Sequence, residues 1–137
     1  MKIDNQTLIK YALNAKKSSY SPYSNFSVGA ALLTKNNKIF TGCNIESSAF
    51  SATVCAERTA FFKAISEGEK NFEAIAIVGS KHGSNITNFC PPCGICLQVM
   101  SEFCDPDNFS IILFNGEISK VFKLNDLLPF SFNKALI

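Results

Sequence analysis

Two short, almost purely apolar runs constrain the fold most: residues 73–79, EAIAIVG, and residues 110–114, SIILF. Each run has the length of a strand, and its apolar residues do not alternate with polar ones. Such strands are typical of a sheet whose two faces are both covered. Residues 93–104, CGICLQVMSEFC, lie between the runs and are expected to form a helix that ends at Asp105-Pro106. The chain is therefore expected to fold as a layered α/β domain.

Apolar spacing and turn residues indicate the remaining elements. In chain order they are a helix at 5–17, strands at 26–34 and 39–45 joined by a turn at 35–38, a helix at 53–68 that ends near Gly68, a strand at 118–122 after an Asn115-Gly116 turn, and a short helix and loop from 124 onward. The order α-β-β-α-β-α-β-β-α predicts one domain over residues 1–137 with a mixed five-stranded sheet.

Charge and hydropathy argue against several kinds of partner. The net charge is only +2, and the lysines are scattered without a basic stripe, which argues against nucleic acid. The start, MKIDNQTLIK, is polar where the apolar part of a signal peptide would begin, and no apolar run approaches the roughly 18–20 residues of a membrane span. We therefore expect a cytoplasmic protein that binds no membrane. In a reducing compartment, clustered cysteines more often bind metal or catalyse than form disulfides.

The topology is expected to bring distant cysteines to one edge of the sheet. The helix 53–68 leaves this edge, the strand 73–79 returns to it, and the loop 80–92 stays there until the next helix begins. Cys55 and Cys93 should therefore lie close together, each at a helix N-terminus. The helix dipole and the free backbone N–H groups favour thiolates at such positions.

A third cysteine, Cys96, follows Cys93 by three positions and should share its helix face. Pro92 suits the position just inside the helix N-terminus, where no amide proton is required. The thiolates of Cys55, Cys93 and Cys96 can thus bind one Zn²⁺ ion. Three protein ligands and one open position are the pattern of catalytic zinc, whereas structural zinc has four protein ligands.

Two charged residues, Glu57 and Arg58, lie two and three positions after Cys55. Glu57 can approach the open metal position without being a ligand, and a carboxylate at that place is suited to shuttle protons. Three thiolates and Zn²⁺ sum to a net charge of −1, which weakens the metal as a Lewis acid. Arg58, the single arginine of the chain, is expected to hydrogen-bond the ligand sulfurs and offset that charge. The alternative is an ordinary surface arginine on a helix.

The motifs CAERTA at 55–60 and PCGIC at 92–96 resemble those of the small, homotetrameric, zinc-dependent cytidine deaminases. A lone CxxC is weak evidence, whereas C-A-E followed 35 residues later by P-C-x-x-C is specific. The resemblance implies a three-layer α/β/α sandwich with one zinc ion per subunit. It also implies hydrolytic deamination of cytidine and deoxycytidine to uridine and deoxyuridine with release of ammonia, for pyrimidine nucleoside salvage, with Glu57 as the catalytic residue.

The segments YSPYSNFSVGAALLT and GCNIESSAFS look like the nucleoside-binding segments of that family. The resemblance implies that Asn44 and Glu46 hydrogen-bond the ribose and that a neighbouring subunit completes each pocket. The further substrate-binding candidates are Phe26, Phe50, Ala56 and Phe132. Asn44 and Glu46 lie two apart at a strand end, so their side chains point the same way. The alternatives are polar residues of a loop for this pair and core packing for each phenylalanine.

The chain departs from the family pattern at three positions. Leu97 stands where an arginine is common, so Arg58 is the only guanidinium available to tune the zinc. Phe50 stands where a tyrosine is usual, so a hydroxyl contact is expected to be missing. Cys90 replaces a small polar residue and is expected to take no part in the chemistry.

Three rival interpretations remain from the sequence. The first is a deaminase with another substrate, such as a nucleotide, an aminonucleoside antibiotic or a base in RNA. The second is a structural zinc site of four sulfurs, with Cys90 added to Cys55, Cys93 and Cys96. The third is a redox pair in CGIC, which leaves Cys55 and Glu57 without a role.

Overall fold

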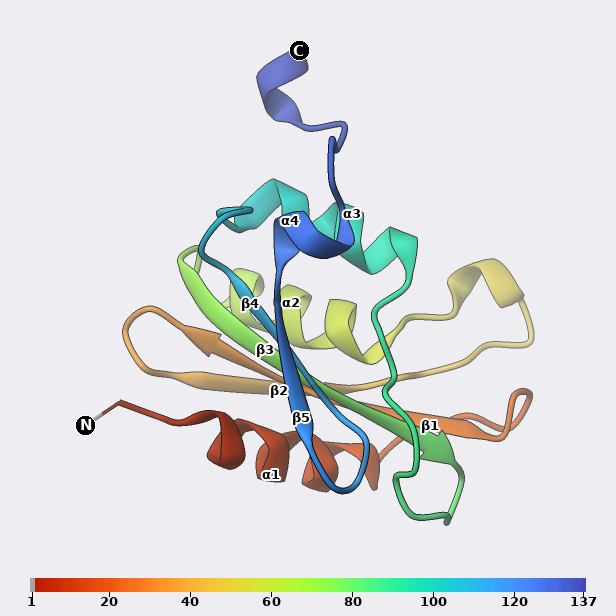
Figure 1. Ribbon diagram of the computed structural model, residues 1–137. Helices are drawn as coiled ribbons and strands as arrows, with labels where there is room; N and C mark the ends of the chain where they lie inside the picture. Colours follow the sequence, from red (N-terminus) through yellow and green to blue (C-terminus); the bar gives the residue numbers. More distant parts are fainter. Residues whose placement is uncertain (1) are drawn as a thin grey trace.

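The computed structural model describes residues 2–137 and has three layers (Figure 1). The middle layer is a five-stranded sheet with the order β2-β1-β3-β4-β5. Helix α1 covers one face of the sheet, and α2 and α3 cover the other. The strands are β1 Phe26–Thr34, β2 Ile39–Cys43, β3 Phe72–Lys81, β4 Ser110–Phe114 and β5 Ser119–Lys123; the helices are α1 Asn5–Lys16, α2 Ala56–Ser66, α3 Gly94–Phe103 and α4 Leu124–Leu127, with 3₁₀ turns at Phe50–Ala52 and Lys134–Leu136.

The pairing of the strands confirms the predicted mixed sheet. β1 pairs antiparallel with both β2 and β3, β3 pairs parallel with β4, and β4 pairs antiparallel with β5. The two apolar runs that suggested a covered sheet are β3 and β4, its inner parallel pair. Element bounds differ from the prediction by a few residues, and β3 continues to Lys81 because it pairs along the whole length of β1.

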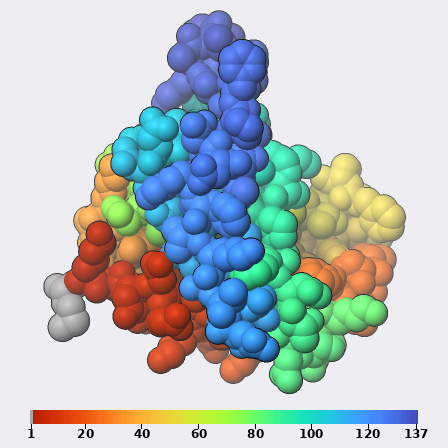
Figure 2. Space-filling model, viewed as in Figure 1, coloured from red at the N-terminus to blue at the C-terminus, as the bar shows by residue number. Residues whose placement is uncertain are grey.

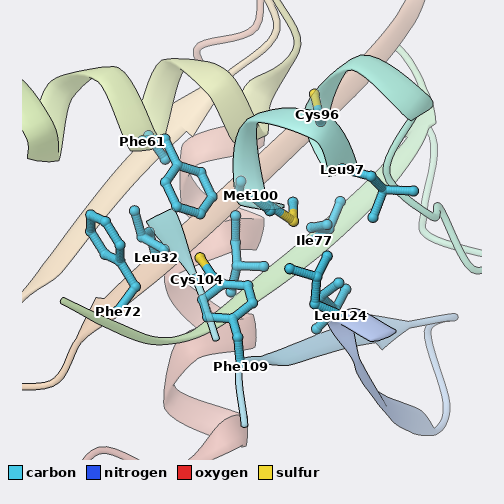
Figure 3. Packing of buried hydrophobic residues seen from close by; sticks show 14 of the residues in the cluster. Leu32, Phe61, Phe72, Ile77, Cys96, Leu97, Met100, Cys104, Phe109 and Leu124 are labelled. Carbon is cyan, nitrogen blue, oxygen red and sulfur yellow. The ribbon is translucent and has the colours of Figure 1, made fainter. Parts of the chain in front are cut away.

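The two faces of the sheet carry separate apolar clusters. The larger lies beneath α2 and α3 and contains Phe61, Phe72 and Phe109. The Phe61 ring packs edge-on against Phe72 at 5.1 Å and lies 6.1 Å from Phe109. Figure 3 shows this group, with Cys96 at its edge on α3. The smaller cluster lies beneath α1. Because both faces are covered, uniformly apolar strands are stable here.

Close packing at Gly42 places the start of α2 directly on β2. A Cβ atom at this position would lie 2.4 Å from the backbone oxygen of Ala56 and 2.6 Å from the backbone nitrogen of Ala60. Only glycine therefore lets the helix approach so closely. The residues that begin α2, including Cys55 and Glu57, take their position from this contact.

The C-terminal segment extends away from the layered body (Figures 1 and 2). It is tied to α3 by a hydrogen bond of 2.8 Å from Gln98 Nε2 to the Phe132 carbonyl oxygen. Several of its apolar side chains are exposed: Phe130, Phe132, Leu136 and Ile137. No helix within residues 2–137 is long and apolar enough to cross a membrane.

Candidate metal centre and active site

The structure brings together the three sulfur atoms that the sequence predicts to converge. The Sγ atoms of Cys55, Cys93 and Cys96 all lie within 4.8 Å of one another. Those of Cys55 and Cys93 are 3.6 Å apart although the residues are 38 positions apart in sequence. Cys93 is exposed, Cys55 is half-buried and Cys96 is buried. The cluster therefore has one side open to solvent.

Both cysteines lie at helix N-termini, as the sequence predicts. Cys55 is the N-cap residue of α2, and Cys93 is the N-cap residue of α3. Neither side chain caps its own helix, so both thiols remain available for other bonds. The prediction for Pro92 is wrong by two positions. Since α3 begins at Gly94, Pro92 precedes the cap, where its fixed backbone angle directs the chain into the helix.

The donor set fits a zinc ion. Sulfur is a preferred zinc ligand, and zinc–sulfur bonds of about 2.3 Å in a tetrahedron hold two sulfurs about 3.8 Å apart. The observed separations need only small side-chain adjustments to reach that value. A hydrogen bond from the Cys96 thiol, with further ones from Arg58 and Cys93, lowers the pKa of the Cys55 thiol to about 5 despite burial. The site thus stabilises a thiolate, the form that binds metal.

Glu57 lies in the first turn of α2 with only 4% of its surface exposed. Burial raises the pKa of its carboxyl group to about 7, and the negative charge of Cys55 adds to the shift. A carboxyl group with a pKa near the working pH can both accept and release a proton. Its place beside the thiols suits it to proton transfer at a bound metal.

Arg58 contacts the cluster as the sequence predicts. Its Nη2 atom lies 3.5 Å from Cys55 Sγ and 3.5 Å from the carbonyl oxygen of Thr53. Its Nε atom is buried and has no hydrogen-bond partner among residues 2–137. The guanidinium therefore places positive charge next to Cys55 Sγ, and its Nε–H group can still donate a hydrogen bond.

Cys90 stands outside the sulfur cluster. Cys90 packs against Gly79 and Phe26 instead: a Cβ atom added at Gly79 would lie 2.7 Å from Cys90 Sγ and 2.9 Å from the Phe26 ring. Burial raises the pKa of the Cys90 thiol to about 12, so this group stays protonated at neutral pH. Within residues 2–137, the metal-competent group consists of three cysteines and does not include Cys90. This geometry argues against the four-sulfur structural site.

A cavity of about 380 Å³ is lined by Tyr23, Ser24, Glu46, Phe50 and Thr53. Its volume lies within the usual range for small-molecule sites, roughly 300–1,000 Å³. Thr53 connects the cavity to the cluster, because Arg58 Nη2 contacts both the Thr53 carbonyl oxygen and Cys55 Sγ. Phe50 packs edge-on against Tyr23 with ring centroids 5.7 Å apart. Tyr23 and Ser24 lie in the segment at 20–34 that resembles a nucleoside-binding segment, but neither was singled out from the sequence, and Thr53 was not identified. The Ser- and Tyr-rich loop at 18–25 was the available signal, because such loops often carry binding groups.

Glu46 holds the loop that forms one wall of this cavity. Its Oε1 atom accepts hydrogen bonds from the backbone N–H groups of Tyr23 and Ser24, at 2.9 and 3.1 Å. Its Oε2 atom accepts from the Ser24 hydroxyl. Hydrogen bonds from Ser24, and from the backbone of Tyr23, lower the pKa of the Glu46 carboxyl group. Glu46 therefore stays ionised and retains acceptor capacity for a ligand.

Asn44 lies on the same side of the chain as Glu46, since Ile45 between them pairs with Tyr20 and Val54. The Asn44 Nδ2 atom donates to the Phe26 carbonyl oxygen at 2.8 Å, and its Oδ1 atom accepts from the Val28 N–H at 2.9 Å. The side chain is 8% exposed. These bonds fix the orientation of the amide.

The remaining candidates differ in where they lie. Phe26 is 38% exposed and contacts the Gly79 region; Ala56 is fully buried at the start of α2. Phe132 is exposed on the C-terminal segment and does not line the cavity of its own chain. Leu97, on α3, is buried and packs within the larger apolar cluster.

Comparison with known proteins identifies this combination of fold and site. The model of the cytidine and deoxycytidylate deaminase zinc-binding region matches residues 2–111, a span that includes the three thiols and Glu57. The chain belongs to this deaminase family. The cytidine deaminase of Sporosarcina psychrophila is 45% identical over 134 residues, which cover 96% of this chain and 93% of the relative. That of Halalkalibacterium halodurans is 45% identical over 132 residues, 95% of each chain.

Solved structures of deaminases share the fold. The crystal structure of cytidine deaminase from Burkholderia pseudomallei superposes with a TM-score of 0.85 at 42% identity, covering 95% of this chain and 100% of that one. The α/β fold with its mixed sheet is thereby confirmed. As a member of the family, this deaminase carries the zinc-binding region, and Cys55, Cys93 and Cys96 form a possible metal site within it.

Proposed function

We propose that this deaminase hydrolyses cytidine and deoxycytidine to uridine and deoxyuridine with release of ammonia, with one zinc ion per subunit. The observation that carries the proposal is a buried carboxyl group, Glu57, beside three convergent thiols with an open side. Two cytidine deaminases are 45% identical to this chain, and the matches cover 93% and 95% of those relatives. The reaction is proposed to serve the salvage of pyrimidine nucleosides.

Zinc held by the three thiolates supplies a Lewis acid and an activated water at neutral pH. Glu57 takes a proton from the attacking water and passes it to N3 of cytosine. The oxygen then bonds to C4 and gives a tetrahedral intermediate. Glu57 next takes the proton of the new C4 hydroxyl and gives it to the amino group; the C4–N bond breaks as the C4=O double bond forms, and ammonia and uridine leave. Burial of Glu57 keeps its carboxyl group away from bulk water.

Asn44 and Glu46 are proposed to bind the ribose. The Asn44 amide has one N–H left after its bond to the Phe26 carbonyl oxygen, so it can only donate to the substrate. Ionised Glu46 can only accept. A ribose hydroxyl has both a proton and lone pairs, and therefore suits this pair. Phe26, Phe50 and the backbone at Ala56 are proposed to contact the base and sugar.

A neighbouring subunit is proposed to complete each pocket within a homotetramer. The cavity is open in the single chain, and the C-terminal segment carries exposed apolar residues on an extension from the body (Figure 2). Phe132, which is 63% exposed, is the residue proposed to reach the neighbouring site. Light scattering of the purified protein tests this assembly, and a monomer at micromolar concentration would contradict it.

The direct test is ammonia release from cytidine by the purified protein, with and without a strong zinc chelator. Chelator-sensitive release is expected. Absence of release from folded, zinc-loaded protein would refute the proposed substrate. Cytidine, deoxycytidine and their monophosphates should be compared in the same assay. Preference for a monophosphate would favour the nucleotide alternative, whereas the CAERTA and NIE motifs favour the free nucleoside.

A further inference from the structure

A chain of side-chain hydrogen bonds connects His82, at the end of β3, with Asn44. His82 Nδ1 lies 3.3 Å from the Ser27 hydroxyl, which lies 3.3 Å from the Ser21 hydroxyl. Ser21 lies 3.2 Å from the Ser19 hydroxyl, and Ser19 donates to Asn44 Oδ1. Ser21, Ser27 and Asn44 are at most 8% exposed. The chain therefore joins four segments through a largely buried path.

Proton counting identifies the donor of the bond that reaches Asn44. The Oδ1 atom of Asn44 can only accept, so this bond uses the one proton of the Ser19 hydroxyl. Ser19 is also the donor in its contact with Ser21, so the two acceptors compete for the same proton. Either partner can donate in the contacts between Ser21 and Ser27 and between Ser27 and His82.

The consequence for Asn44 is a fully engaged amide oxygen. Oδ1 accepts from the Val28 N–H and from the Ser19 hydroxyl, which uses both of its lone pairs. Nδ2 donates one proton to the Phe26 carbonyl oxygen and keeps one free. Rotation of the amide by 180° would place NH₂ against two donors. Asn44 can therefore present only an N–H to a ligand.

We propose that Ser19 is a positioning residue, which holds the Asn44 amide so that its remaining N–H donates to a ribose hydroxyl of the substrate. This inference rests on the proposed function, because it takes the ribose as the ligand of Asn44. Ser19 acts through Asn44 and touches no reacting atom. Its removal should therefore weaken substrate binding and leave the chemical step unchanged.

The test compares Ser19→Ala with the matched control Ser18→Ala, an exposed neighbour in the same loop. Loss of one hydrogen bond predicts that Ser19→Ala raises KM for cytidine about threefold to tenfold with kcat unchanged. Ser19→Thr keeps the hydroxyl and should restore KM. Ser21→Ala, which leaves the Ser19–Asn44 bond in place, should raise KM by less than Ser19→Ala.

A substrate without the 2′- and 3′-hydroxyls separates positioning from general damage. On 2′,3′-dideoxycytidine, Ser19→Ala should match the parent enzyme, because the 2′- and 3′-hydroxyls, one of which Asn44 is proposed to bind, are both absent. Equal losses on cytidine and the dideoxy substrate, or no loss on cytidine, would overturn the inference. A parent enzyme that is zinc-loaded yet inactive on cytidine would instead refute the proposed function itself.

Discussion

Gly42 packs beneath the first turn of α2, so a single added methyl group tests how the sheet positions Cys55 and Glu57. In Gly42→Ala the new Cβ would lie 2.4 Å from the Ala56 backbone oxygen, whereas ordinary contact begins at 3.4 Å. The helix start must therefore move by about 1.0 Å, which is 3.4 Å minus 2.4 Å. Overpacking of this kind costs about 1–3 kcal/mol of stability.

A displacement of this size matters for catalysis because Cys55 and Glu57 move and Cys93 does not. A misplacement of about 1 Å can reduce the rate about 10²-fold. The expected result is lower zinc occupancy and a loss of kcat/KM on that order, measured by metal analysis and by ammonia release well below the melting temperature.

Gly29→Ala is the matched control for this experiment. Its Cβ would lie 2.1 Å from the Ala12 backbone oxygen of α1, on the opposite face of the sheet. Comparable destabilisation is expected in urea unfolding, with zinc content and kcat close to those of the parent. If Gly42→Ala lost stability but kept full zinc and activity, the argument that the β2–α2 contact sets the site would be wrong.

Four further predictions follow from named contacts. Cys55→Ala should lose zinc and stability, since the metal site supports the fold, and full occupancy by metal analysis would contradict its assignment as a ligand. Cys90→Ser should keep zinc and activity; zinc loss would revive the four-sulfur site. Phe132→Ala should raise KM in the assembled enzyme while leaving zinc content unchanged, and an unchanged KM would remove Phe132 from the pocket. The pKa of Glu46 is lowered in the folded protein, so its ionised form stabilises the loop above about pH 4.5, and this stabilisation is lost as the pH falls through the lowered pKa. Glu46→Gln should therefore flatten the acid side of a curve of stability against pH. An unchanged curve would argue against the loop contact.

The layers and the convergence of the thiols were predictable because they depend on patterns that the sequence carries directly. Uniformly apolar strands require cover on both faces, and β3 and β4 have it. Short connections return the chain to the same sheet edge, so Cys55 and Cys93 meet. Neither inference needs the conformation of a loop.

The walls of the cavity were not predictable in the same way. The Glu46 carboxylate binds the backbone of Tyr23 and Ser24, and such contacts depend on loop conformation, which leaves no periodic signal. The 3₁₀ turn at Phe50–Ala52 is too short to have a period. Pro92 was expected inside the helix because proline favours that position, but Cys93 is the N-cap residue and α3 begins only at Gly94.

The most direct test of the account is turnover by Glu57→Gln at measured zinc content. The substitution keeps the size of the side chain and removes the group proposed to move protons. Full zinc occupancy with kcat reduced by about 10²–10⁴-fold or more is expected. Glu67→Gln, an exposed position at the other end of the same helix, should match the parent. Turnover of cytidine by zinc-loaded Glu57→Gln at the parent rate would contradict the central role given to Glu57.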